Sequence, residues 1–352
     1  MIKSTKMKTL IQYGFLLFLI LLTSYIVSTT LNVKLIPEII HMVNKKYIGL
    51  GFLIIGIYLF LESYITRIII ESIQPTNVKG IGFKMAMMGL YYNLITPLAS
   101  GSQPMQIYAL TKYNINLSKS VAIVTNKTVI YQIVVTIYSG VLILFNIKLL
   151  GEEMPAILIL MTTGMVINIV SIGIGMLIIF SPNKMKKIID ILLRVLTKFR
   201  VLKFLKNKKE KIYYYIDEYN ESVLIFIKDK KSLLYSFILT FVQLTLYFSI
   251  SYCVYRTFNL SQLTYIKLLT LQVFLYISVS PIPTPGNIGA NELVFYTIFA
   301  NVFPKEIIGY SVFLYSGFVY YIIAIVCGVF TVFTHYDIAK YSKTKEKSIF
   351  AK

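Results

Sequence analysis

The sequence predicts an all-α polytopic membrane protein with six full transmembrane helices and two short broken helical hairpins, which makes eight apolar units. Its composition is the first indication: 57% of the residues are hydrophobic and 14% are charged, and the mean hydropathy is +0.72. A soluble domain carries about 25% charged residues. The second indication is a set of six long apolar runs, and the third is a pair of apolar stretches interrupted by proline, glycine and polar residues.

Each of the six long runs reaches the roughly 20 residues that an α-helix needs to cross a bilayer. They are Leu10–Leu31, Tyr47–Ile70, Ser120–Phe145, Pro155–Phe180, Ser232–Tyr255 and Ile307–Thr334. The first run follows a basic start, but it exceeds the 7–15 apolar residues typical of a signal peptide. We therefore interpret it as a retained first helix.

The distribution of basic residues predicts that both termini lie in the cytoplasm. Basic residues concentrate on the cytoplasmic side of membrane proteins. The N-terminal tail, the segments 71–84, 112–119 and 181–231, and the C-terminal tail carry 26 of the 35 Lys and Arg, and the opposite loops carry 6. This N-in, C-in orientation makes the hairpin 84–118 start and end in the cytoplasm and the hairpin 264–303 start and end outside.

The two hairpins share a broken centre. One break is TPLASGSQPMQIY (residues 96–108) and the other is SPIPTPGNIGANE (residues 280–292). A proline is followed four residues later by glycine in both, at Pro97 and Gly101 and at Pro285 and Gly289. The shared pattern and the opposite polarity predict an inverted repeat, and such paired breaks mark midplane substrate sites in transporters. The pattern leaves open whether the hairpins are re-entrant or short tilted pairs.

Proline and glycine interrupt the helical hydrogen bonds, and the freed backbone groups cannot face lipid. They must be buried in protein, line a wet cavity or bind a ligand. A helix that begins near Pro104 would direct its N-terminal N–H groups at the break, which suits phosphate or carboxylate. The alternative is that both breaks only kink their helices.

Four ionisable residues lie at membrane depth: Glu62, Arg67, Lys127 and Glu292. Such residues are functional hypotheses by default. Each also has a structural alternative. Arg67 could pair with Glu71 one turn later, Lys127 could extend to the membrane surface, and Glu292 could cap its helix.

The chain divides into four regions: a first membrane half (1–180), a cytoplasmic basic segment (181–231), a second membrane half (232–334) and a basic cytoplasmic tail (335–352). Within the basic segment, apolar residues follow helical spacing and predict an interfacial amphipathic helix; they are Ile188, Ile191, Leu192, Val195, Leu196 and Phe199. A solvated basic linker is the alternative. We expect the tail to be disordered.

The sequence offers little for metal or nucleophilic chemistry. Two isolated cysteines (Cys253 and Cys327) and two histidines (His41 and His335) form no metal-ligand or catalytic spacing. We expect no cofactor and, without a nucleotide-binding loop, no direct use of ATP. The net charge of +20 is explained better by anionic lipid head groups than by nucleic acid.

The broken segments resemble a known family. GLYYNLITPLASGSQPMQIYALTKYNI, with NKTVIYQI following, resembles the first signature of the flippase-like family named for the lysylphosphatidylglycerol synthase transmembrane region. PIPTPGNIGANELVFYTIF is similar to its second signature. The matching residues are Asn93, Pro97, Gly101, Gln103, Pro104, Gln106, Lys127, Pro283, Pro285, Gly286, Gly289 and Glu292. Family members often have Gly-Gly at Gly101-Ser102 and Trp-Arg at Tyr315-Ser316, so the anion contact of that arginine is missing here.

The resemblance implies an integral protein of the bacterial inner membrane that moves a phospholipid, such as (lysyl-)phosphatidylglycerol, or another lipid-linked anion between leaflets. Anionic or aminoacylated phospholipid and the bilayer are then the expected partners. Lys127 and Arg67 would hold phosphate, Glu292 would hold a cationic head group or orient the break, and we add Glu62 to the candidate lipid-binding residues. A separate synthase subunit and a homo-oligomer stay open.

Two alternatives remain at this point. One is a phosphatidylglycerol lysyltransferase, alone or with a separate catalytic subunit. Bifunctional relatives carry a soluble transferase domain after the membrane part, whereas about 18 residues follow Thr334 here. The other is a scaffold that organises envelope enzymes without transporting lipid.

Overall fold

The computed structural model describes residues 43–98, 100–146, 155–196 and 209–350. The predicted first span, Leu10–Leu31, lies outside the described residues. The other predicted spans are confirmed as five helices long and apolar enough to cross a membrane. They are Lys45–Ile73, Leu117–Asn146, Ala156–Met176, Lys230–Thr257 and Ile308–Ser342. Among the described residues the regular secondary structure is helical, the connections are turns and loops, and the β-pairing is limited to one isolated β-bridge.

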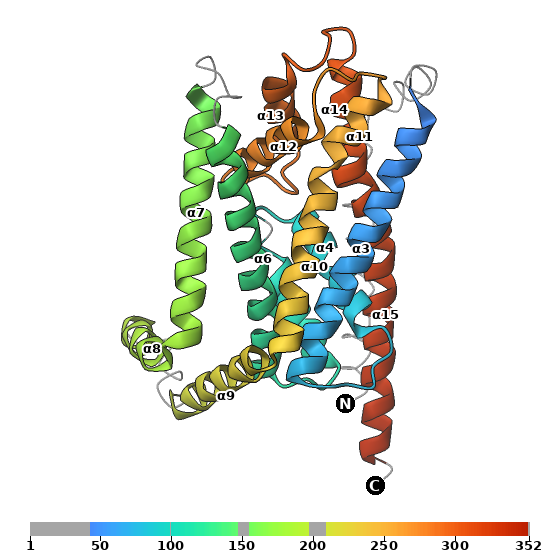
Figure 1. Cartoon of the computed structure of the whole chain (residues 1–352). Coiled ribbons are helices and arrows are strands. Elements are labelled where there is room, and N and C mark those ends of the chain that lie inside the picture. The colour runs from blue at the N-terminus through green and yellow to red at the C-terminus, as the bar shows by residue number, and fades with distance from the viewer. Residues whose placement is uncertain (1–42, 99, 147–154, 197–208, 351–352) are drawn as a thin grey trace.

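The same order of elements, a long helix, a broken hairpin and a long helix, occurs twice (Figure 1). The first set is α3 (Lys45–Ile73), α4 (Ile81–Ile95), α5 (Ser102–Lys112) and α6 (Leu117–Asn146). The second set is α10 (Lys230–Phe248), α11 (Ile250–Thr257), α12 (Tyr265–Val279), α13 (Ala290–Phe299), α14 (Ile308–Ser316), the π-helical turn η4 (Gly317–Ile322) and α15 (Ile323–Phe350). In Figure 1, α3 and α10 run in opposite directions, as an inverted repeat requires.

The hairpin helices are too short to cross a bilayer one at a time. Helices α4 and α12 have 15 residues each, α5 has 11 and α13 has 10. At 1.5 Å per residue these lengths correspond to roughly 15–23 Å, against a hydrocarbon core of about 30 Å. The structure therefore favours the re-entrant interpretation of both hairpins.

The first break begins where the threonine at the end of α4 takes over backbone hydrogen bonds. The Thr96 hydroxyl donates to the Tyr92 carbonyl (2.6 Å) and accepts from the Gly101 N–H (2.9 Å). Pro97 follows, and Leu98 has a left-handed φ of 53°. Proline and a left-handed residue cannot continue an α-helix, so α4 ends here and α5 starts at Ser102.

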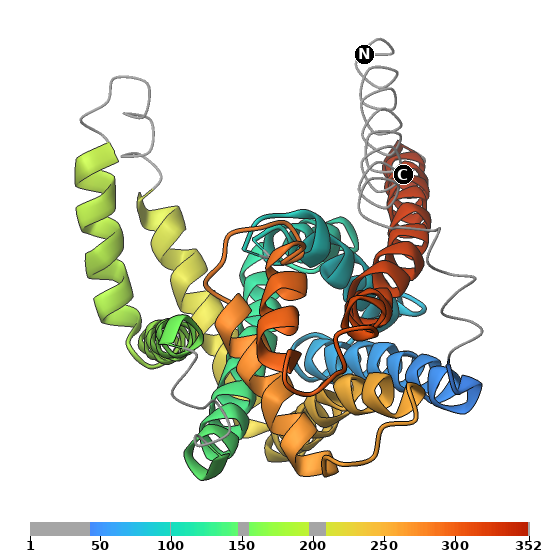
Figure 2. The same cartoon turned by 90° about the horizontal axis from the view of Figure 1, so that it is seen from above.

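The basic middle segment forms two helices, α8 (Pro182–Leu196) and α9 (Lys209–Lys228), after α7 (Pro155–Phe180). Figure 2 shows α8 and α9 lying across the direction of α7. Asp190 joins the two helices: it accepts from Lys209 (2.8 Å) and from the Tyr213 hydroxyl (2.5 Å), and the bonds from Lys209 and then Tyr213 lower its pKa. Ile188 and Ile191 are exposed, which agrees with the predicted amphipathic pattern. Phe199 lies outside the described residues.

The expectation of a disordered C-terminal tail is wrong up to Phe350. Helix α15 continues without a break from the membrane span to Phe350. Residues 335–350 contain neither proline nor glycine, so nothing in the sequence stops the helix. The basic composition of the tail predicted solvent exposure, but exposure is compatible with helix as well as with disorder.

Asp229 directly follows α9 and connects it with α10 and α3, so a substitution at this residue tests this part of the fold. Its carboxylate caps α10 by accepting from the Ser232 N–H (3.1 Å), and it accepts from the Ser72 hydroxyl on α3 (2.8 Å). Hydrogen bonds from Ser232 and then from Ser72 lower the pKa of Asp229 below its usual 3.8. Because the pKa is lowered on folding, the carboxylate stabilises the fold at neutral pH, and this contribution is lost as the pH falls below about 3.8.

We expect Asp229→Ala to lower the free energy of unfolding by about 1 kcal/mol at neutral pH, the usual effect of losing an N-cap. The difference from the wild type should shrink as the pH falls through the lowered pKa of the wild-type carboxyl, because the carboxyl then becomes protonated. Asp229→Asn is the control, since asparagine caps as well as aspartate and does not titrate. Denaturation of the purified protein in detergent measures all three, and an equal loss in both variants would contradict the cap.

Candidate functional site

The two breaks contact each other at two prolines that are both exposed. Pro97 in the first break and Pro285 in the second form an isolated antiparallel β-bridge. The neighbouring Gly286 has φ +58°, and a Cβ built on it would lie 2.5 Å from the Leu94 carbonyl oxygen and 2.4 Å from Tyr320. Only a residue without a side chain fits this approach of one hairpin to the other. The structure thus brings together two motifs that lie about 190 residues apart in the chain.

Helix α5 returns from the first break along α4 and α6. The buried Gln106 amide donates to the Met85 carbonyl on α4 (2.8 Å). It lies directly over Gly89, where an added Cβ would be 2.1 Å from the amide nitrogen. Gln103, in the first turn of α5, donates to the Thr128 hydroxyl on α6 at a long 3.5 Å. The start of α5 is thereby placed beside the turn of α6 that carries Lys127.

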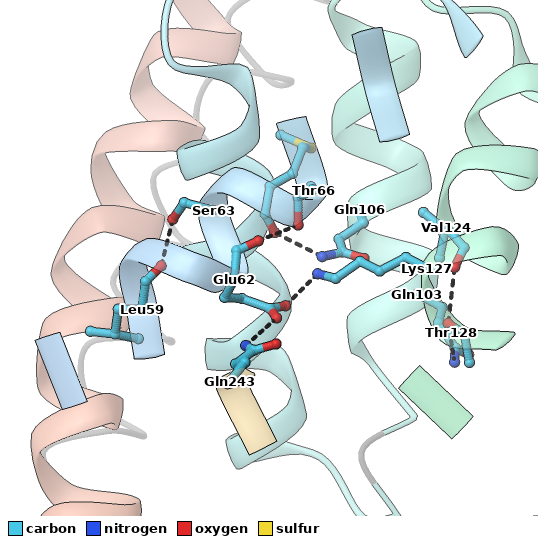
Figure 3. A network of polar contacts seen from close by, with 11 residues as sticks. Leu59, Glu62, Ser63, Thr66, Gln103, Gln106, Val124, Lys127, Thr128 and Gln243 are labelled. Carbon is cyan, nitrogen blue, oxygen red and sulfur yellow. Dashed lines mark hydrogen bonds and ion pairs between the residues drawn. The ribbon is translucent and has the colours of Figure 1, made fainter. Parts of the chain in front are cut away.

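Lys127 and Glu62 form an ion pair between α6 and α3 (Figure 3). The side chains are 16% and 11% exposed, so both charges are largely withdrawn from solvent. The second carboxylate oxygen of Glu62 accepts from the buried Gln243 amide on α10 (2.8 Å). The sequence selected Glu62 and Lys127 as separate candidates, and the structure makes them one site with a third helix.

This arrangement places a positive charge next to its counter-charge, and the residue after Lys127, Thr128, contacts the first turn of α5. A buried ion pair is held by Coulomb attraction that roughly balances the cost of desolvation. A ligand that brings its own charge can compete for one partner, and the displaced partner then needs a new counter-charge or must lose its own charge. A lysine ammonium and helical N–H groups are both suited to phosphate.

The comparison with known families agrees with this geometry. A family model described as the lysylphosphatidylglycerol synthase TM region matches residues 10–327. The chain belongs to this family. Neither a search of curated proteins nor a search of solved structures found a match.

In this member of the lysylphosphatidylglycerol synthase TM family, Glu292 supports the second break. Its carboxylate accepts from the Gly289 N–H (2.7 Å) and from the Ser316 hydroxyl on α14 (2.6 Å). Gly289 begins α13 with φ +77°, so the carboxylate caps the helix start and anchors it to the last span. This is the capping alternative.

Arg67 lies away from the ion pair of Glu62 and Lys127. It pairs with Glu71 one turn later on α3 (2.7 Å), and the two side chains are 60% and 48% exposed. Glu62 and Arg67 are five residues apart, so the buried face of α3 carries Glu62 and the exposed face carries Arg67. The geometry corresponds to the i, i+4 surface pair that was the alternative for Arg67.

The remaining predicted site residues build the breaks and their flanks. Asn93 lies in the last turn of α4, and Gly101 precedes α5. Pro104 is exposed in the first turn of α5, and Pro283 is exposed in the second break. Their positions agree with the predicted breaks, and their part in binding remains a prediction.

Sequence reasoning missed three contributors: Gln243, Ser316 and Tyr320. Gln243 makes an interhelical hydrogen bond whose acceptor is the candidate carboxylate Glu62. A glutamine within an apolar span was the available signal. Ser316 stood out in the sequence only as a departure from the family pattern, and Tyr320 gave no signal. Among the described residues, no group of His, Cys, Asp and Glu could hold a metal ion.

Proposed function

We propose that this protein binds the head group of an anionic or aminoacylated phospholipid where its two broken hairpins meet, and moves the lipid between leaflets. The observation that carries the proposal is the contact of the two breaks, Pro97 against Pro285, in a family of membrane proteins named for lipid synthesis. Irregular backbone at membrane depth is tolerated where it is buried or lines a polar path. Two such segments in one place supply that path.

Lys127 supplies the charge for the phosphate. It is largely buried, the adjacent Thr128 contacts Gln103 in the first turn of α5, and Glu62 neutralises it in the absence of lipid. An incoming phosphate replaces this carboxylate as the partner of the ammonium. In an aminoacylated lipid, the ammonium of the head group then pairs with the released Glu62.

Glu292 has a positioning role in this proposal. Both of its oxygens already accept hydrogen bonds within the protein, so it holds the second break in place instead of offering a free carboxylate to a cationic head group. Arg67, which pairs with Glu71 at the surface, takes no part.

The proposal is tested with purified protein in phosphatidylcholine vesicles that contain a trace of phosphatidylglycerol labelled with a fluorophore on its acyl chain. Dithionite quenches label in the outer leaflet, so movement from the inner leaflet is read as loss of fluorescence. We expect Lys127→Ala to slow this movement at least tenfold. Lys267→Ala, which removes an exposed lysine on α12, is the control and should leave the rate unchanged. Equal rates for both variants would remove the role of Lys127.

The lysyltransferase alternative is separated by lipid extracts from cells with and without the gene. Loss of lysyl-lipid synthesis would favour the enzyme. Lipid that is synthesised but stays in the inner leaflet would favour the translocase. If neither lipid change occurs and envelope enzymes are captured with the protein, the scaffold is favoured.

A further inference from the structure

The ion pair at the centre of the site has a consequence for energy coupling. Glu62 and Lys127 neutralise each other, with their side chains 11% and 16% exposed. If a phosphate takes Lys127, the Glu62 carboxylate loses its counter-charge while it is still buried. An uncompensated buried charge is strongly unfavourable, and a carboxylate in that position becomes neutral by binding a proton.

Among the described residues, no second cation forms an ion pair with Glu62. Lys127 on α6 is the charged partner of Glu62 among the described side chains. The titratable groups that interact with it electrostatically are Tyr58, one turn earlier on α3, and the Cys327 thiol on α15. Both are neutral near pH 7, so neither can replace the positive charge of Lys127.

Gln243 suits a carboxyl group that changes its protonation state. Its amide nitrogen donates to the Glu62 carboxylate (2.8 Å). A carboxamide carries a donor and an acceptor on the same carbon, so a rotation of the side chain presents its oxygen to a protonated Glu62. An ammonium or guanidinium at this position could stabilise only the ionised form.

We propose that Glu62 carries a proton with each anionic lipid that has no amine in its head group, so that the protein is a proton–lipid symporter. This rests on the proposed lipid movement. The proton comes from water on the side where the lipid enters, binds a Glu62 oxygen as the phosphate takes Lys127, and is released to water on the other side when the lipid leaves and the ion pair re-forms. One anion and one proton cross together, so the step moves no net charge.

The test uses the labelled phosphatidylglycerol in phosphatidylcholine vesicles, now with an imposed pH gradient. At equilibrium a symporter of one proton with one lipid concentrates the lipid on the alkaline side by about tenfold per pH unit. A potassium diffusion potential set with valinomycin should have no effect on this ratio. Protein-free vesicles over the same interval give the background.

Glu62→Gln removes the proton site and keeps the shape. In this variant the ratio of labelled lipid between the two leaflets at equilibrium should be independent of the pH gradient and should depend on the membrane voltage. This expectation holds whatever the rate at which the variant moves lipid. Glu71→Gln, which alters an exposed carboxylate on the same helix, should keep the tenfold ratio. Lipid movement in the wild type that is independent of pH would overturn the coupling and leave the proposed function intact, whereas absence of any wild-type movement would overturn both.

A second measurement does not depend on a variant. Phosphatidylglycerol is added to the wild-type protein in detergent and weak buffer, with a pH indicator. We expect uptake of about one proton for each lipid bound. Binding without proton uptake would show that Glu62 keeps its charge and that the symport is wrong.

Discussion

Replacing Lys127 with methionine is expected to lower the free energy of unfolding by about 3–5 kcal/mol, the cost of leaving one partner of a buried ion pair without its counter-charge. Methionine keeps most of the volume of lysine, so packing changes little. The loss would come from the Glu62 carboxylate, which retains Gln243 as its partner but has no neighbouring cation.

The double variant Glu62→Gln/Lys127→Met separates charge from packing. It contains no uncompensated charge, and the glutamine can still bond to Gln243. We therefore expect it to recover most of the lost stability while lipid movement stays at the level of Lys127→Met. A double variant as unstable as the single one would show that the ion pair is not the source of the loss.

Unfolding can be followed through the two cysteines. Cys253 and Cys327 are free and buried. They react with a thiol-specific fluorophore when the protein opens, and denaturant titration in detergent then gives the free energy. Arg67→Met is the control, because its ion pair with Glu71 is exposed and should contribute no resolvable stability.

Replacing Gly286 with alanine is expected to lower the free energy of unfolding by about 2–5 kcal/mol. A left-handed φ costs a residue with a side chain about 1–2 kcal/mol, and overpacking adds about 1–3. The added methyl group would overlap the Leu94 carbonyl and the Tyr320 ring. Tyr320 can rotate, but the carbonyl is backbone, so the two hairpins must move apart.

Gly289→Ala is the matched control for this prediction. Gly289 also has a left-handed φ, of 77°, but a Cβ there meets open space. Its cost should be limited to the backbone strain of a positive φ, without the overpacking contribution, and lipid movement should persist. In Gly286→Ala the meeting of Pro97 and Pro285 is disturbed, and we expect lipid movement to fall at least tenfold. Equal effects of the two variants would indicate that the contact between the breaks is unimportant.

Much of the fold could be predicted because the bilayer restricts it. The lengths of the apolar runs identified five of the described spans, and proline and glycine identified both breaks at their correct positions. The disordered tail was a wrong prediction, since basic composition signals exposure and does not exclude helix.

The site was predicted as a set of residues and not as an arrangement. Glu62 and Lys127 stood out because charge is rare at membrane depth. Their pairing depends on how α3 and α6 are rotated against each other, which the weak periodicity of nearly uniform apolar helices does not specify. The same limitation hid the Gln243 partner and the contact of Ser316 with Glu292.

The sequence by itself determined that the chain is a helical membrane protein with two interrupted hairpins, because solvation by lipid acts on every residue separately. The tertiary structure decided that these interruptions touch at Pro97 and Pro285, that Lys127 is neutralised by Glu62, and that Arg67 stays at the surface. These outcomes depend on contacts between residues up to about 190 positions apart. Side-chain packing between helices determines such contacts, and the local sequence pattern does not predict them.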